Sequence, residues 1–186
     1  NIAHQISEFW TGYGWGNAIT LVQNGDGKDA YVAEAISELN KQYDLVKIRS
    51  KTQELGRFVE IGAVCNVYID TNMEWKVGKS FFTIDILDPR TSFVVRSNYY
   101  PDKRVMLGVT YRSDKKTGKK YFTCFTKDYR FEVVGLVKTT NGSTKKDKWE
   151  HDTRSGEENP LGVVPIVEYI RSYDRMGVWE HQLSEM

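Results

Sequence analysis

The sequence predicts an α+β protein, in which a helical hairpin packs with a mostly antiparallel meander sheet and a C-terminal helix leads out of the domain. Apolar residues recur at three- and four-residue steps over 29–62, which is typical of amphipathic helices. From Ala63 onward, β-forming residues separated by short turns dominate. The chain of 186 residues is 40% apolar, which is enough to bury one core. We therefore expect one domain over residues 1–170 and the start of the departing helix over 171–186.

The helical segments are indicated by their apolar spacing and their ends. Residues 2–10 have helical spacing, and the glycines within 12–16 are expected to end that helix in a turn. Residues 17–23 have the composition of a short strand. Asp29 is placed to cap the next helix, and the second helix of the hairpin is expected to end near Gly62.

The strands are indicated by alternating polarity between turn-forming dipeptides. Asp-Pro, Pro-Asp, Lys-Thr-Gly, Lys-Asp and Asn-Gly turns separate them, and links this short favour antiparallel neighbours. Residues 151–159 are interpreted as a polar link before the last strand. After a first strand from Val64, the expected strands span 80–87, 92–97, 104–112, 120–126, 129–137, 144–151 and 164–170.

Positive charge is concentrated in one region. Residues 112–148 contain eleven Lys or Arg and four Asp or Glu, whereas the whole chain has a net charge of +1. Lysines at hairpin tips and sheet edges hinder strand-to-strand aggregation, which is the interpretation we favour. Contact with DNA phosphates is the alternative, and binding that weakens with salt would test it. The lysines concerned are Lys115, Lys116, Lys119, Lys120, Lys145, Lys146 and Lys148.

The sequence offers few groups for catalysis. The three histidines have no HxxxH or HxH pairing, and the cysteines have no Cys-x-x-Cys partner, so we expect no metal site, no cofactor and no catalytic residue. A small hydrolase is a weaker alternative. It would use Asp85 with Asp88, or Glu157 with Glu158, as acid and base.

The two cysteines are expected to be buried and reduced. Cys65 and Cys124 both lie among apolar residues, and a domain of this size does not need a disulfide, although the sequence leaves a bridge between them open. This pattern favours an intracellular origin. No apolar run approaches the roughly 20 residues that cross a bilayer. The chain starts without Met and stops within a helical pattern, so we expect it to be a piece of a longer protein.

The aromatic residues, 13% of the chain, are interpreted mainly as core. Several of them alternate with polar residues as in a sheet buried on one face. The aromatic residues considered are Phe81, Phe82, Phe93, Tyr121, Phe122, Phe125, Tyr129 and Phe131. A stacking platform for bases or sugars is the alternative for these residues. Some tryptophans outside the central strands are candidates for interface anchors: Trp10, Trp15, Trp75 and Trp179.

One run of residues resembles a known family signature. Asn-Pro-Leu-Gly-Val-Val-Pro over 159–165, followed by an apolar strand and by Asp174-Arg-Met-Gly-Val-Trp, is similar to a motif of siphovirus-type portal proteins of tailed bacteriophages. The glycine turn at 12–16, the helix-to-strand passage at 57–70 and the Leu-Asp-Pro strand pair at 84–95 look alike in the same order. The residues of these motifs are Leu87, Asp88, Pro89, Asn159, Pro160, Leu161, Gly162, Pro165 and Gly177.

The resemblance implies a structural role. In that family about twelve subunits form a ring at one capsid vertex, and DNA passes through its channel. This chain looks like the wing region, with the stem and the motor-docking clip outside it. The implied partners are further copies of the chain, the capsid protein, terminase, head-completion proteins and passing DNA. The implied location is the portal vertex of the virion, after synthesis in the bacterial cytoplasm. A nucleic-acid-binding module of a viral assembly stays open as an alternative.

Overall fold

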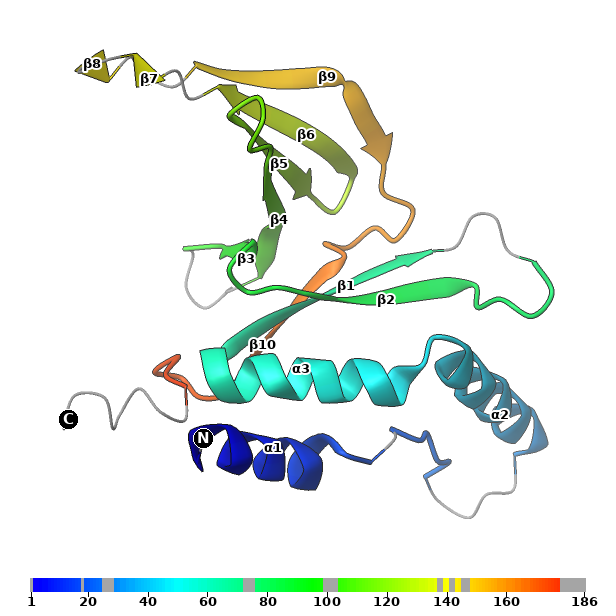
Figure 1. The fold of residues 1–186 in the computed structure, drawn as a ribbon. Coiled ribbons are helices and arrows are strands. Elements are labelled where there is room, and N and C mark those ends of the chain that lie inside the picture. Colours follow the sequence, from blue (N-terminus) through cyan, green and yellow to red (C-terminus); the bar gives the residue numbers. More distant parts are fainter. Residues whose placement is uncertain are drawn as a thin grey trace. The chain divides into compact units, whose positions relative to one another are not determined.

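The computed structural model describes residues 2–17, 19–24, 29–71, 76–98, 104–136, 139–140, 143–144 and 148–177, with the backbone alone over 136–155 (Figure 1). These residues form helices and mostly antiparallel sheets, so the chain is α+β, as the sequence predicts. The chain divides into two compact units. Unit 1 comprises Asn1–Ile86 and Tyr169–Met186, and unit 2 comprises Leu87–Glu168. The domain expected over 1–170 therefore contains all of unit 2 and most of unit 1.

Unit 1 is built from helices on a small sheet. In the sheet, β1 (Val64–Thr71) lies between β10 (Ile166–Ile170) and β2 (Phe82–Leu87). Helix α3 (Ile48–Gly62) lies between β1 and α1 (Ile2–Trp15), as Figure 1 shows. The core joins the inner side of α3 to β1 through four buried residues: Leu55, Val59, Cys65 and Val67.

The predicted helical hairpin is present. The Asp29 carboxylate caps α2 (Ala30–Leu45) by accepting hydrogen bonds from the backbone N–H groups of Tyr31 at 3.0 Å and Val32 at 3.3 Å, which confirms the predicted start. Only two residues separate α2 from α3, and the second of them, Lys47, has a left-handed φ of 57°. The structure adds that the contact between α3 and α1 is more extensive than the contact between α3 and α2.

Two expectations for the first 24 residues are wrong. Helix α1 continues through Gly12 and Gly14 to Trp15, because the Trp15 ring packs on Gly56 of α3 and this contact outweighs the low helix propensity of glycine. The described residues between 17 and 24 form no strand. Instead, the side-chain amide of Asn40 accepts a hydrogen bond from the Leu21 N–H at 2.9 Å and donates one to the Leu21 carbonyl at 3.0 Å. These two hydrogen bonds take the place of those to a neighbouring strand.

Unit 2 contains the predicted meander. Its five strands lie in the order β3-β4-β5-β6-β9, and every neighbouring pair is antiparallel. Between β6 and β9, β7 (Thr139–Thr140) pairs with β8 (Ser143–Thr144) as a small hairpin. The sheet strands are β3 (Ser92–Arg96), β4 (Val105–Ser113), β5 (Lys119–Phe125), β6 (Tyr129–Leu136) and β9 (Lys148–Glu158).

Two predictions for the last 40 residues need correction. The polar link expected from residue 151 is strand up to Glu158, because after a register shift Glu157 and Glu158 still pair with β6. The start of the departing helix expected over 171–186 is not helical over 171–177. Arg175 has a φ of 55°, which is incompatible with an α-helix, and the Asp174 carboxylate accepts from the Met176 N–H at 3.2 Å. Residues 178–186 lie outside the described part of the chain.

No helix in the described ranges combines the length and the apolar character that crossing a membrane requires.

Candidate interaction surfaces

The first residue of the Asn-Pro-Leu-Gly motif links two segments of unit 2. The Asn159 amide nitrogen donates to the Thr126 carbonyl at 2.9 Å and to the Val163 carbonyl at 2.6 Å, and the amide oxygen accepts from the Leu161 N–H at 3.1 Å. The Asn159 backbone N–H donates to the Asp128 carbonyl at 2.8 Å. Asn159 therefore holds the chain leaving β9 against the turn between β5 and β6.

The rest of this motif sets the backbone path into β10. Gly162 has a φ of +64°, a conformation that favours glycine, and Pro160 and Pro165 fix φ on either side. The next residue, Ile166, is 2% exposed and packs against Gly108 of β4. The sequence predicted this rigid bend, but the hydrogen bonds of Asn159 were not foreseen.

Gly177, the last described motif residue, makes a close backbone contact within unit 1. A Cβ at this position would overlap the Ile61 carbonyl oxygen near the end of α3. The contact is possible only without a side chain, so Gly177 is a packing residue.

The Leu-Asp-Pro motif forms the turn between β2 and β3. Leu87 ends β2, and the Asp88 carboxylate accepts from the Arg90 guanidinium at 2.6 and 3.0 Å and from the Arg90 N–H at 2.9 Å. These hydrogen bonds hold the pKa of Asp88 below its ordinary value and raise that of Arg90. The Asp88 carbonyl accepts from the Thr91 N–H at 2.9 Å, with Pro89 inside the turn. These contacts shape the backbone.

The first group of predicted lysines lies on one hairpin. Lys115 and Lys116 are exposed in the turn between β4 and β5, whereas Lys119 and Lys120 are half-buried in β5. The Asp114 carboxylate accepts from the Thr117 hydroxyl at 2.6 Å and from the Lys116 N–H at 2.9 Å, and both bonds lower its pKa. For the second group, Lys148 lies in β9, and Lys145 and Lys146 lie outside the described residues.

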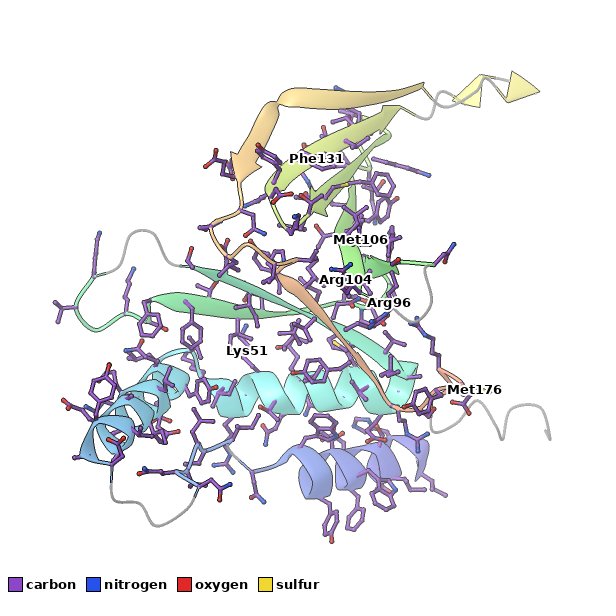
Figure 2. The ribbon with its side chains drawn as sticks, turned by 180° about the vertical axis from the view of Figure 1, so that it is seen from behind. Lys51, Arg96, Arg104, Met106, Phe131 and Met176 are labelled. Atoms are coloured by element: carbon purple, nitrogen blue, oxygen red, sulfur yellow. The ribbon has the colours of Figure 1, made fainter. Side chains whose placement is uncertain are left out.

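Helix α1 exposes an apolar stripe, whereas the sequence analysis recognised its helical spacing without predicting which side faces solvent. Ile2, Ile6, Phe9 and Tyr13 follow at steps of four, three and four residues, and they are 75, 36, 65 and 76% exposed. The rings of Phe9 and Tyr13 stack at 6.3 Å, and Trp10 meets both edge-on. Figure 2 shows side chains projecting from α1 on the side away from α3. We call these five residues the α1 stripe.

The opposite side of α1 is polar yet buried. Ser7 is 7% exposed and Thr11 4%, which small side chains permit where two helices approach closely. The formal charge of α1 comes from Glu8, which pairs with Arg57 of α3 at 3.3 Å. The α1 stripe therefore lacks Lys, Arg, Asp and Glu, a composition typical of the centre of a protein interface.

The predicted interface anchors have different surroundings. Trp10 is 49% exposed and belongs to the α1 stripe. Trp15 instead packs on Gly56, and its ring N–H lies 3.5 Å from Glu60 Oε1. Trp75 and Trp179 lie outside the described residues.

Three of the four carboxylates suggested for a hydrolase form ion pairs with cations. Lys51 pairs with Asp85 at 3.1 Å, Arg90 with Asp88, and Arg130 with Glu157 at 3.8 Å. For Asp88, the hydrogen bonds from Arg90 lower the pKa of the carboxyl, which disfavours a role as general acid. Within the described ranges, no three His, Cys, Asp or Glu side chains gather to hold a metal ion. A cavity of about 210 Å³ in unit 1 is lined mostly by apolar side chains.

Comparison with known proteins finds no matching family model and no matching curated protein.

Proposed function

We propose that this chain is the wing part of a portal-ring subunit, which forms the DNA channel at a capsid vertex and supports DNA packaging and head–tail joining. The proposal rests on the order of the portal-like motifs at 57–70, 84–95 and 159–177, whereas the glycine turn expected at 12–16 is instead part of α1 up to Trp15. Several residues of these motifs fix the path of the backbone. Asn159 joins two segments, Gly162 allows a left-handed turn and Gly177 allows a close contact. A structural subunit needs such fixed geometry and no reactive group.

The α1 stripe supports the assembly part of this proposal. A helix that turns its aromatic side outward and its small polar side inward exposes apolar surface that association would bury. In the proposed ring, the stripe contacts the neighbouring subunit. Capsid protein, terminase, head-completion proteins and DNA are the other proposed partners, the virion is the proposed location, and the subunit is not an enzyme.

The test is the mass of the assembly formed by the longer chain that also carries the proposed stem. Native mass spectrometry should find a ring of about twelve copies. Replacing both Phe9 and Tyr13 with Ser should shift the ring to smaller species, since buried aromatic anchors often contribute about 2 kcal/mol or more each. Tyr31→Ser is the matched control, because Tyr31 is 81% exposed on α2.

Two outcomes would count against these proposals. A longer chain that stays monomeric at every concentration tried would refute the portal assignment. A ring that keeps its mass and stability in the double variant would refute the role of the α1 stripe and leave the assignment standing.

A further inference from the structure

One face of the unit 2 sheet carries an aromatic side chain from each of four adjacent strands. The strand register places them there. Val109 lies opposite Cys124, and two residues along the same strands Tyr111 lies opposite Phe122. Residues two apart share a face, and residues directly opposite also share it. The four aromatic residues are Phe93 in β3, Tyr111 in β4, Phe122 in β5 and Phe131 in β6.

Part of this face forms an open groove. The groove has a volume of about 310 Å³, and its apolar walls are Phe93, Tyr111 and Phe122. Phe93 is 47% exposed, and the rings of Tyr111 and Phe122 lie 5.0 Å apart at 39°. The Tyr111 N–H donates to the Thr91 carbonyl at 2.6 Å, which holds the start of β3 beside β4. The walls thus come from paired strands of a single sheet.

Two cations complete the groove. Lys120 lies two residues before Phe122 and so projects from the same face, and in the described part of the chain it has no ion-pair partner. Arg90 also lines the groove, with its guanidinium oriented by Asp88 and its side chain 84% exposed. The exposed lysines of the β4–β5 turn extend the positive charge beyond it.

We propose that this groove binds a nucleotide unit of a single-stranded nucleic acid. The base stacks on the exposed ring of Phe93, beside the half-buried Tyr111, and its phosphate contacts Lys120, with Arg90 as the second cation. Solvent-facing aromatics on neighbouring strands and nearby cations are the features by which sheets bind single strands. A duplex hides the faces of its bases, and an acidic peptide supplies charge without them. This proposal is independent of the proposed ring.

The test measures binding of the full chain to fluorescein-labelled oligothymidylate and oligouridylate of about twelve nucleotides by anisotropy, over a series of salt concentrations. Phe93→Leu keeps an apolar side chain but removes the ring. It should weaken binding roughly 5- to 150-fold at every salt concentration, with an unchanged salt slope. Lys120→Gln should weaken binding most at low salt and reduce the slope of log K against log salt by about 0.7.

The matched control is Lys127→Gln, which removes one lysine, 71% exposed, from the turn between β5 and β6. It should leave both affinity and slope unchanged. Polyglutamate and a duplex of the same length should bind more weakly than the single strands. The proposal is overturned by absence of single-strand binding at low salt, by equal binding of duplex or polyglutamate, or by equal effects of Lys127→Gln and Lys120→Gln. Because Lys120 is only half-buried and Gln has a similar length, its variant tests the proposal even if Phe93→Leu fails to fold.

Discussion

Replacing Asn159 with Ala should destabilise unit 2. The substitution removes three side-chain hydrogen bonds, to the Thr126 and Val163 carbonyls and from the Leu161 N–H. Each such bond contributes about 0.5–1.5 kcal/mol, and because water can replace part of these bonds in a half-buried turn, we expect a loss of about 1.5–3 kcal/mol. With a urea m-value of about 2 kcal/mol/M, the midpoint falls by about 1 M.

The assay is urea unfolding followed by circular dichroism, and if the two units unfold separately the shift belongs to the transition of unit 2. Val163→Ala is the matched control, because it shortens a 60% exposed side chain in the same turn and should change stability by no more than about 0.5 kcal/mol. The reasoning about Asn159 is refuted if its variant is no less stable than this control.

Three further changes test other contacts. Gly177→Ala should destabilise unit 1 by about 1–3 kcal/mol in thermal unfolding, because the added methyl group would overlap backbone atoms. Gly12→Ala should stabilise it by about 0.5–1 kcal/mol, because Gly12 lies within α1 and has free space around its Cβ position. Changes of the same sign in the two variants would contradict this reasoning. Cys65 and Cys124 are 0 and 7% exposed, and burial raises the pKa of Cys124, so a thiol reagent should modify them only after unfolding. The lowered pKa of Asp88 means that its stabilising effect is present above about pH 4 and lost as pH falls further; Asp88→Asn should remove this dependence, and an unchanged pH profile would speak against it.

Local sequence patterns correctly predicted the elements that are fixed by residues close to them in the sequence. The Asp29 cap and the strand-turn-strand series of the meander follow from hydrogen-bonding side chains and turn residues next to them in sequence. The path after β9 was predicted in part, because Gly162 and the two prolines signal a bend. The hydrogen bonds of the Asn159 side chain were not predicted, because this side chain reaches the Thr126 carbonyl, 33 residues away in sequence.

Other features depend on partners that are distant in sequence. Helix α1 continues past its glycines because Trp15 packs on Gly56. Residues 19–24 are not a strand, and the Asn40 side chain instead forms hydrogen bonds with both backbone groups of Leu21. The apolar spacing of α1 was visible, but spacing does not say which side faces the core. Ser7 and Thr11 turn inward, so the aromatic side faces solvent.

The order of the strands in unit 1 has a consequence for synthesis on the ribosome. Strand β1 pairs with β10, yet nearly all of unit 2 is translated after β2 and before β10. At about 5–20 residues per second, roughly 4–17 s separate the end of β2 from the end of β10. During that interval β1 has one unpaired edge beside its buried Cys65 and Val67, a site at which another nascent chain can pair. Because unit 2 is one continuous segment, it can fold before β10 is made, which reduces the length of unfolded chain during that interval.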